Sequence, residues 1–452
     1  MIVKTIHEIA NMMHASVHGD IDDTKKIHGV VIDSRQVTKD VLYVPIIGQR
    51  VDGHTFAKQT IEDGALISLW QKDHHPYPDF PVILVDDTLR AMQELAKAYL
   101  DELHPLVIGV TGSNGKTSCK DMLYSIFSQE KKTQKTLGNR NSEIGLPLTI
   151  FEFDEDIEVA ILEMGMENKG EITQLTSIAQ PDISVITSIG SAHMENLGGR
   201  VQIAQAKCEI LEGLKDNGLF VYNYESKEMQ EVLPTLNTGN KKIVSFGHGG
   251  DVSITSSIEY GKDGIVFNCN ILDVPVHLHA FGDFQAMNAL PCIYIAKACH
   301  LKEESILNGL AHLEMTKMRT QLIPVQNAYI LDDTYKSNPE SAKAAIDTLM
   351  VLPARKHIAI LSDMLDLGSE EKQLHYDVGE YAKEKGVDAL YCTGPLSKET
   401  SDGFNGNWYE TKDEIYEAVK PLLEEDCVIL IKGSRAMKMD TLVDAFRGND
   451  NE

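Results

Sequence analysis

The feature that most constrains the fold is the stretch VIGVTGSNGKTSCKDML at residues 107–123. Its apolar run breaks into a glycine-rich turn that ends in Gly115-Lys116-Thr117 and then resumes as an amphipathic helix. The N–H groups of such a turn and of the helix N-terminus hold phosphate oxygens, while the lysine reaches the terminal phosphates and the threonine hydroxyl ligates Mg2+. The stretch therefore predicts a strand, a phosphate-binding loop and a helix that bind ATP or GTP. The predicted nucleotide contacts in the loop are Thr111, Gly112, Ser113, Asn114, Gly115, Lys116, Thr117 and Ser118.

The loop has a compact form. The general pattern G-x-x-x-x-G-K-[ST] has a glycine where this chain has Val110, which leaves the shorter T-G-x-N-G-K-T. A short Gly-Lys-Thr also occurs in ordinary strand-turn-helix connections, which is the alternative interpretation. The apolar strand before the turn and the helix after it favour the phosphate loop.

Composition indicates a globular enzyme of several domains. The 452 residues exceed one ordinary core, and 42% hydrophobic residues are enough to fill two or three domains. The net charge of -26 repels phosphate backbones, which argues against nucleic-acid binding. The 7 cysteines are scattered without a C-x-x-C pair, so we expect reduced thiols rather than a disulfide framework or a zinc site.

The sequence also bears on location. No uninterrupted apolar run approaches the roughly 18 residues of a membrane span. The segment MIVKTIHEIANMM at residues 1–13 predicts an amphipathic helix with acidic and histidine interruptions rather than a signal sequence. We therefore expect a cytoplasmic, monomeric protein without a membrane span.

Three α/β units follow one another, so the predicted fold class is α/β. Residues 1–84 form a small N-terminal unit with short strands in GVVIDSR, VLYVPI and PVILVDD. Residues 85–314 begin with the helix TLRAMQELAKAYLDEL. Their strands VIGVTG, EVAILEMG, ISVITSIG and LFVYNY alternate with helices such as GRVQIAQAKCEILEGL, which predicts a doubly wound, P-loop ATPase-like sheet. Residues 315–452 alternate AYILDDTY, HIAILSD, ALYCTG and CVILIKGS with helices and predict a Rossmann-like unit without a G-x-G-x-x-G fingerprint.

Three residues after the loop are candidates for chemistry. Glu163 ends the run VAILE, so its carboxylate is expected at the carboxyl end of a strand, where a Mg2+ ligand belongs. His193 follows the next strand and could complete a metal site or contact a phosphate. The alternatives are a solvent-facing carboxylate and an ordinary loop histidine. Lys207 lies in the predicted helix IAQAKCEIL, where a lone lysine is usually a solvated surface residue.

An ordered set of motifs extends across nearly the whole chain. It comprises TGSNGKT, GNRNSEIGLPL, LEMGM, AHMENLG, AQAKCEIL, MNA, MRTQ, DDTYKSNP and SDMLDLG. In this order and spacing, the chain resembles the Mur ligase family of peptidoglycan synthesis. The segments DSR at residues 33–35, VDGHTF at residues 51–56, EIGLPLTI and LSDMLDLG are most similar to the members that add D-alanyl-D-alanine to UDP-N-acetylmuramoyl-tripeptide.

The resemblance implies an activity. The family uses ATP to phosphorylate a substrate carboxylate, and the amine of the incoming amino acid or dipeptide attacks the acyl phosphate and releases phosphate. The implied partners are a UDP-linked muramoyl peptide and a D-alanyl-D-alanine-like amine, with Mg2+ as cofactor. No protein nucleophile is needed, so catalysis depends on positioning and on cations that neutralise the reacting anions.

The resemblance also implies catalytic and metal-binding roles. The Thr117 hydroxyl and the Glu163 position bind Mg2+, and the His193 position helps to bind a second Mg2+. The Lys207 position is carbamylated by CO2 in the family, which turns a cation into an anionic support for the second metal. The implied catalytic residues are Lys116, Glu163, His193 and Lys207.

Further positions match nucleotide and substrate contacts of the family. Asn288, Arg319 and Asp333 match positions that hold adenine, phosphate and ribose. The alternatives for these three residues are a helix cap, a surface arginine and a turn aspartate. The implied contacts to the UDP-linked substrate are Ser34, Arg35, Asp52, Gly53, His54, Asn139, Asn141 and Ser142.

Several motifs depart from the family pattern near the nucleotide and acceptor sites. The pattern G-K-H-N-x-x-N reads GDFQAMN at residues 282–288, so Gln285 replaces the first asparagine imperfectly. The pattern Y-N-A-x-P reads YKSNP at residues 335–339, so Lys336 puts a cation where an amide usually approaches the nucleotide. Two alternative functions stay open: a paralogous ligase that joins a different carboxylate and amine in a specialised peptide pathway, and a catalytically silent binding protein that has kept the fold.

Overall fold

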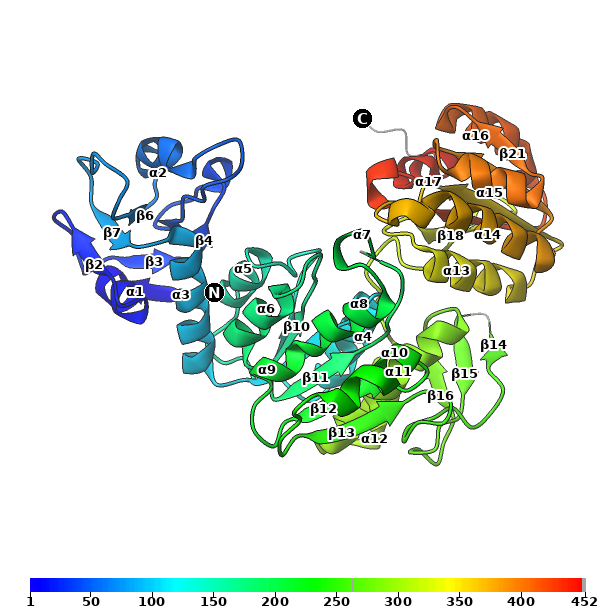
Figure 1. The fold of residues 1–452 in the computed structure, drawn as a ribbon, viewed down its shortest axis with the longest axis horizontal. Helices are drawn as coiled ribbons and strands as arrows, with labels where there is room; N and C mark the ends of the chain where they lie inside the picture. The colour runs from blue at the N-terminus through cyan, green and yellow to red at the C-terminus, as the bar shows by residue number, and fades with distance from the viewer. Residues whose placement is uncertain (193, 262, 449–452) are drawn as a thin grey trace.

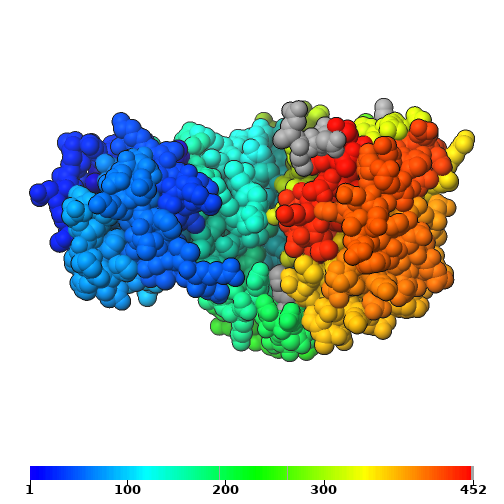
Figure 2. Space-filling view, turned by 90° about the horizontal axis from the view of Figure 1, so that it is seen from above, coloured from blue at the N-terminus to red at the C-terminus, as the bar shows by residue number. Residues whose placement is uncertain are grey.

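The computed structural model describes residues 1–192, 194–261 and 263–448. It contains three α/β units that follow one another across the molecule (Figure 1). The first unit, in blue, and the third unit, in orange and red, lie at opposite ends with the second unit between them (Figure 2). This architecture confirms the predicted fold class. The boundaries near residues 84 and 314 stay predictions.

The first unit is built on a five-stranded sheet in the order β2-β7-β6-β5-β4, with β1 and β3 forming a separate antiparallel pair. Its elements are β1 Val3–Thr5, α1 Ile6–Met12, β2 Ser16–His18, β3 Lys26–His28, β4 Val30–Val31, β5 Leu42–Tyr43, α2 Ala57–Glu62, β6 Ile67–Gln71 and β7 Val82–Val85. The predicted helix over residues 1–13 is wrong at its start, where β1 pairs with β3. The helix begins only after Thr5, because the side chains of Thr5 and Glu8 cap each other's backbone N–H groups.

Helix α3, Thr88–Leu103, connects the first two units and coincides with the segment predicted as a helix. The Asp87 carboxylate caps it by accepting a hydrogen bond from the Arg90 N–H at 2.7 Å. Its buried side chains, such as Met92 and Leu95, belong to a hydrophobic cluster that also contains residues of the first unit and of the central sheet. The helix therefore packs against both units.

Six parallel strands form the sheet of the second unit, in the order β13-β12-β11-β8-β10-β9. They are β8 Leu106–Thr111, β9 Thr133–Lys135, β10 Val159–Glu163, β11 Ile183–Ile186, β12 Leu219–Asn223 and β13 Lys242–Phe246. Val107 and Leu162 enter one hydrophobic cluster, whereas their neighbours Ile108 and Ile161 enter another. Both faces of the sheet are therefore buried, which confirms the doubly wound sheet.

Helices cover the two faces of this sheet. One face packs against α4 Lys116–Phe127, α11 Asp283–Ala298 and α12 Glu303–Ala311. The other packs against α5 Gly145–Phe151, α6 Glu171–Ala179, α8 Arg200–Cys208 and α9 Ile210–Gly213. The segment at residues 199–214 was predicted as one helix but divides at Glu209 into α8 and α9. A small antiparallel sheet, β14 Glu259–Tyr260, β15 Ile265–Phe267 and β16 Val276–Leu278, was not predicted.

The third unit contains a six-stranded sheet in the order β17-β18-β22-β19-β20-β21. Only the edge strand β17 is antiparallel, so the unit is Rossmann-like, as predicted. Its strands are β17 Gln321–Val325, β18 Ala328–Asp333, β19 Lys356–Ser362, β20 Ala389–Thr393, β21 Asn407–Tyr409 and β22 Cys427–Lys432. Its helices are α13 Pro339–Val351, α14 Glu371–Glu384, α15 Ser397–Phe404, α16 Lys412–Val419 and α17 Asp440–Phe446.

The order of the central strands positions the site. Strand β8 lies between β10 and β11, so the loops that follow these three parallel strands meet at one edge of the sheet. The carboxyl edge of such a sheet is where ligands bind in doubly wound folds. Across the part of the chain that the structure describes, no helix is both long and apolar enough to cross a membrane.

Candidate functional site

The loop after β8 depends on two glycines. Gly112 has φ +151° and Gly115 has φ +83°, and Gly115 is the residue before α4. A Cβ atom on Gly112 would lie 2.0 Å from the Thr187 hydroxyl oxygen, and one on Gly115 would lie 2.4 Å from the Asn288 amide oxygen. No larger residue fits either position, so the chain makes a tight turn into the N-terminus of α4. This is the strand-loop-helix geometry predicted for a phosphate site.

The Lys116 ammonium folds back over its own loop. It donates hydrogen bonds to the backbone oxygens of Gly112 at 2.7 Å and Ser113 at 3.5 Å. Burial, and after it the positive charge of Lys336, lowers the pKa of Lys116 to about 8. Among the described residues, this half-buried cation donates its hydrogen bonds to neutral carbonyls, so it is well placed to bind an anionic phosphate at this loop.

Three side chains meet beside the loop where a hard cation could bind. The Thr117 hydroxyl donates to Glu163 Oε2 at 3.0 Å, and the Asn141 amide donates to Glu163 Oε1 at 2.9 Å. Thr117 and Glu163 are both buried. The alternative of a solvent-facing Glu163 is therefore wrong. Hydroxyl and carboxylate oxygens at this spacing are suitable Mg2+ ligands.

Lys207 is buried on α8 and not on the surface, which rules out the alternative of a solvated lysine. Its side chain lines a cavity of about 340 Å3 together with Lys116 and Lys336. Burial holds its pKa well below the ordinary value, and the charges of Lys116 and Lys336 add to that effect. The geometry therefore favours a neutral Lys207 amine close to the phosphate loop. The cavity is also lined by Gly112, Ser113, Asn141, Ser142, Glu143, Gly165, Met166, Glu167, Glu171 and Leu175.

The third unit contributes a second cation to the loop. Arg319 Nη2 donates to the Thr117 hydroxyl oxygen at 3.1 Å, and the guanidinium lies 4.2 Å from the centre of the Tyr335 ring. The buried Arg319 Nε has no hydrogen-bond partner among the described residues. This donor set suits the phosphate-binding role predicted for Arg319. The alternative of a surface arginine is wrong.

Two other predicted nucleotide contacts have partners within the protein. Asn288 lies on α11 against Gly115, and its amide donates to Gln285 at 3.3 Å. Asp333 ends β18, where its carboxylate pairs with Lys432 at 2.5 Å and accepts the Thr320 N–H at 3.1 Å. Asn288 therefore lies beside the phosphate loop, and Asp333 lies at the carboxyl end of β18. Their roles toward adenine and ribose stay predictions.

Direct contacts between the second and third units were missed by the sequence analysis. The side-chain amides of Asn114 and Asn338 donate to each other, at 2.9 Å and 3.3 Å. Glu340 accepts hydrogen bonds from the N–H and hydroxyl of Ser191 at 3.1 Å and 2.6 Å. The N-terminus of α13 is therefore docked onto the phosphate loop and the loop after β11. The sequence signal was the Asn-Pro cap of α13, which indicates a helix start but not its partner.

The predicted substrate contacts fall into two groups. Asn141 and Ser142 line the cavity, and Asn139 precedes them in the loop after β9. Ser34, Arg35, Asp52, Gly53 and His54 lie in the first unit instead, outside the cavity. The Arg35 side chain is 85% exposed and pairs with Asp33 at 2.8 Å. His193, the predicted second metal ligand, lies outside the described residues.

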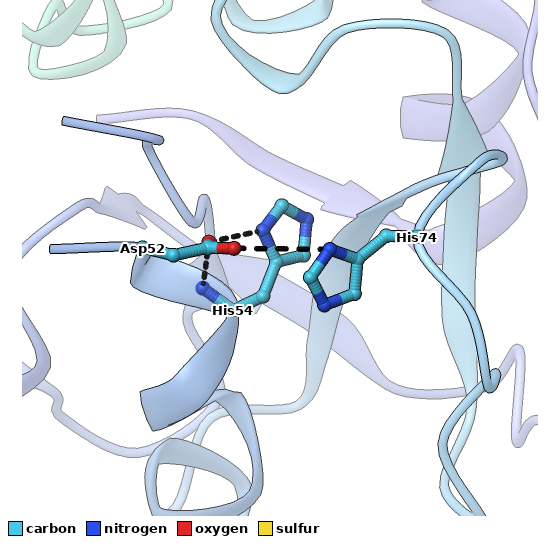
Figure 3. A group of neighbouring side chains, drawn as sticks. All are labelled: Asp52, His54 and His74. Atoms are coloured by element: carbon cyan, nitrogen blue, oxygen red, sulfur yellow. Dashed lines mark hydrogen bonds and ion pairs between the residues drawn. The ribbon is translucent and has the colours of Figure 1, made fainter. Parts of the chain in front are cut away.

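A cluster in the first unit contains potential metal ligands, Asp52, His54 and His74 (Figure 3). The His54 Nδ1–H donates to Asp52 at 2.7 Å, and its Nε2 accepts a long hydrogen bond from the Gln71 N–H at 3.4 Å. The two imidazole rings are stacked, with centres 4.3 Å apart and planes 14° apart. Stacked rings cannot both place one ion in their planes. We therefore interpret the cluster as hydrogen bonding that shapes the segment around Asp52.

Comparison with known proteins identifies the family. Three family models match: the Mur ligase family catalytic domain at residues 26–100, the Mur ligase middle domain at 110–296 and the Mur ligase glutamate ligase domain at 318–435. The UDP-N-acetylmuramoyl-tripeptide--D-alanyl-D-alanine ligase of Bacillus subtilis is 36% identical, covering 98% of both chains. The chain belongs to the Mur ligase family. As a Mur ligase, it is an ATP-dependent, ADP-forming ligase.

Other relatives extend over the whole Mur ligase chain. The ligase of the same name from Escherichia coli is 31% identical, covering 99% of both chains. A crystal structure of MurF from Acinetobacter baumannii aligns with a TM-score of 0.92, 27% identity and 99% coverage of both chains. The MurF ligase of Thermotoga maritima, solved in complex with ADP, aligns with a TM-score of 0.84 and 26% identity, covering 93% of this chain and 97% of its own.

The residues of this Mur ligase fit ATP with Mg2+. Gly112 and Gly115 allow the tight turn against Thr187 and Asn288 into the N-terminus of α4, a geometry that suits a phosphate. The hydroxyl of Thr117 and the carboxylate of Glu163 supply oxygens for the metal. Lys116 and Arg319 supply positive charge on two sides of the loop. These groups come from the phosphate loop, α4 and β10 of the second unit and from the start of the third unit.

Proposed function

We propose that the chain adds D-alanyl-D-alanine to UDP-N-acetylmuramoyl-tripeptide, with ATP as the energy source. The two relatives named for this reaction match 98% and 99% of the chain, and the MurF structures match all three units. The observation that carries the proposal is the cavity beside the phosphate loop, where Lys116, Lys207 and Lys336 converge next to Thr117 and Glu163. Such a site suits the joining of two anions, a carboxylate and a γ-phosphate.

The reaction has two steps. An oxygen of the tripeptide carboxylate bonds to the γ-phosphorus while the bond from phosphorus to ADP breaks, which gives an acyl phosphate and ADP. The amine nitrogen of D-alanyl-D-alanine then bonds to the carbonyl carbon, loses a proton, and expels inorganic phosphate. The protein supplies no nucleophile. Its contribution is to position the partners, to neutralise charge and to exclude water from the acyl phosphate.

Individual residues take distinct roles in the proposed reaction. Lys116 follows the γ-phosphate into the transition state, and Arg319 holds a phosphate oxygen from the side of the third unit. Thr117 and Glu163 would hold Mg2+, which would neutralise charge on the phosphates. Asn288 and Asp333 contact the adenine and the ribose. The nucleotide phosphates bind residues 111–118, and the UDP-linked substrate extends from Ser34, Arg35, Asp52, Gly53 and His54 to Asn139, Asn141 and Ser142.

Lys207 is proposed to carry a carbamate. The neutral amine attacks CO2, a nitrogen-carbon bond forms and one proton leaves, which converts the lysine into an anion. The buried, charge-depressed amine of Lys207 favours this reaction because only the uncharged form is nucleophilic. The carbamate oxygens, together with His193, would then support a second Mg2+. This anion would also relieve the repulsion among three lysines in one cavity.

The proposed location is the cytoplasm, because ATP and a UDP-linked precursor are water-soluble nucleotides.

One specific observation favours a second function, a paralogous ligase with another amine. Lys336 and Gln285 replace the asparagines that the Mur ligase resemblance implies at these positions. Both lie near the phosphate loop, and Lys336 belongs to the unit that receives the amine.

The test is a phosphate-release assay that also identifies the product. The protein is incubated with ATP, Mg2+ and UDP-N-acetylmuramoyl-tripeptide, and D-alanyl-D-alanine is compared with a panel of other dipeptides and amines. The proposal predicts equal amounts of phosphate, ADP and UDP-N-acetylmuramoyl-pentapeptide, with D-alanyl-D-alanine the best acceptor. Faster turnover with another amine would support the paralogous ligase. Nucleotide binding without product from any amine would indicate a silent binding protein.

A further inference from the structure

The third unit places one more cation in the cavity beside the phosphate loop. Lys336 lies between the end of β18 and the N-cap of α13, and its side chain lines the same cavity as Lys116 and Lys207. The sequence predicts that Lys336 approaches the nucleotide. The cavity that it lines also contains Asn141 and Ser142, which are predicted substrate contacts. Lys336 therefore faces the place where phosphate and carboxylate meet.

The main chain around Lys336 is held on both sides. Lys432 donates to the Lys336 backbone oxygen at 2.8 Å and pairs with Asp333 at 2.5 Å. Two residues further on, the Asn338 side chain exchanges hydrogen bonds with Asn114 of the phosphate loop. The position of Lys336 in the cavity is thus fixed by the docking of the third unit onto the second.

The cavity is lined by the lysines Lys116, Lys207 and Lys336 and by the carboxylates of Glu143, Glu167 and Glu171. Lys336 is partly buried, and burial followed by the nearby Arg319 lowers its pKa. Its own charge lowers the pKa of Lys116 and of Lys207. The ammonium groups of Lys116 and Lys336 line one cavity, and two such neighbouring cations bind an anion with several oxygens more strongly than either does alone. The phosphoryl group transferred in the proposed reaction is such an anion.

We propose that Lys336 is a catalytic residue that binds oxygens of the phosphoryl group while it passes from ATP to the peptide carboxylate. This inference rests on the proposed function. An oxygen-phosphorus bond forms, the bond from phosphorus to ADP breaks, and Lys336 keeps its proton and balances charge on the phosphoryl oxygens. Because Lys336 belongs to the third unit, this charge reaches the site only when the third unit is docked. Docking and phosphoryl transfer are thereby coupled.

The first experiment compares Lys336→Met, Lys336→Arg and a control, Lys372→Met, which removes an exposed lysine from the same unit. We expect Lys336→Met to lower kcat about tenfold or more, because it loses one charge contact to the transition state, with little change in KM for ATP or dipeptide. Lys336→Arg should recover most of the rate, and the control should match the unmodified protein. Thermal unfolding of each variant checks the fold.

The second experiment does not depend on the peptide substrate. Binding of ADP with aluminium fluoride, a mimic of the transferring phosphoryl group, is compared with binding of ADP alone. Lys336→Met should weaken the complex with fluoride about tenfold and leave ADP binding unchanged. Unchanged kcat and unchanged fluoride binding would overturn the inference, as would a rise in KM for ATP alone. If D-alanyl-D-alanine is not ligated but fluoride binding still depends on Lys336, the proposed function fails and the inference stands.

Discussion

At the scale of single residues, Glu163 carries the clearest prediction. The variant Glu163→Gln keeps the volume of the side chain and its hydrogen bond from Asn141 but removes the charge that holds a hard cation. We expect the Mg2+ concentration for half-maximal activity to rise about tenfold or more, with the fold retained but somewhat less stable, because the buried Lys120 lies 3.8 Å from Glu163 Oε2. Superimposable Mg2+ titrations of the variant and the unmodified protein would remove Glu163 from the metal site.

Lys207 gives a prediction that separates a carbamate from a plain lysine. Carbamylation needs the neutral amine and dissolved CO2, so activity should fall in CO2-depleted, mildly acidic buffer and partly recover with bicarbonate. Lys207→Ala should be nearly inactive, and a short carboxylic acid should restore some rate by occupying the vacated space. Near-normal turnover of Lys207→Ala would exclude the carbamate.

These two residues show what a sequence reveals about a site. The position of Glu163 follows from strand periodicity, because the carboxyl ends of parallel strands share one edge of the sheet. From the helical pattern alone, Lys207 is predicted to be a solvent-exposed lysine, since a lysine on a helix is usually solvated. Only the motif resemblance indicates a functional position for Lys207. The pair Asn114 and Asn338 lies 224 residues apart, and no local pattern connects them.

At the scale of secondary-structure elements, His375 on α14 predicts a dependence on pH. Its Nδ1–H donates to the Glu371 backbone oxygen at 2.6 Å, and its Nε2 accepts from the Met364 N–H at 2.9 Å. Burial lowers the pKa of His375 below the ordinary 6.5. Between the lowered value and 6.5 the folded state binds fewer protons than the unfolded state, so stability falls as the pH drops through this range.

The check is thermal unfolding of the whole protein at about pH 7.5 and about pH 5.5, a range in which an unperturbed histidine changes charge. His375→Gln does not titrate, so its unfolding temperature should fall less on acidification than that of the unmodified protein. Equal shifts in both proteins would show that His375 does not contribute to the acid sensitivity.

The start of α13 predicts how the third unit docks. Glu340 accepts hydrogen bonds from Ser191 and from Arg200 at 3.4 Å, across the two units. Glu340→Ala should loosen this contact, enlarge the radius of gyration in solution scattering and lower turnover. Glu380→Ala, which removes an exposed carboxylate from α14, is the matched control. Unchanged scattering and turnover for Glu340→Ala would show that docking does not depend on this contact.

Elements differ in how far the sequence predicts them. Helix α3 was predicted residue for residue, because its amphipathic pattern is long and Asp87 supplies a cap. The segment at residues 1–13 contains a strand before its helix, since pairing of β1 with β3 overrides the apolar spacing. Strands β14, β15 and β16 have 2 or 3 residues each, which is too short for a period of two to stand out.

At the scale of the whole molecule, the site is divided between units. The phosphate loop and Glu163 belong to the second unit, while Arg319 and Lys336 arrive with the third unit. Five of the predicted contacts to the UDP-linked substrate lie in the first unit, at the opposite end from the third (Figure 2). The proposed reaction therefore requires the substrate to bridge the units and the units to hold the reacting atoms within about 3 to 3.5 Å.

The central claim is that ATP activates the carboxylate of the tripeptide as an acyl phosphate. The most direct test uses UDP-N-acetylmuramoyl-tripeptide labelled with 18O in its terminal carboxylate, together with ATP, Mg2+ and D-alanyl-D-alanine. Because one carboxylate oxygen bonds to the γ-phosphorus and leaves with it, the account predicts one 18O atom in each phosphate released. Unlabelled phosphate, formed at the same rate as the pentapeptide product, would contradict it.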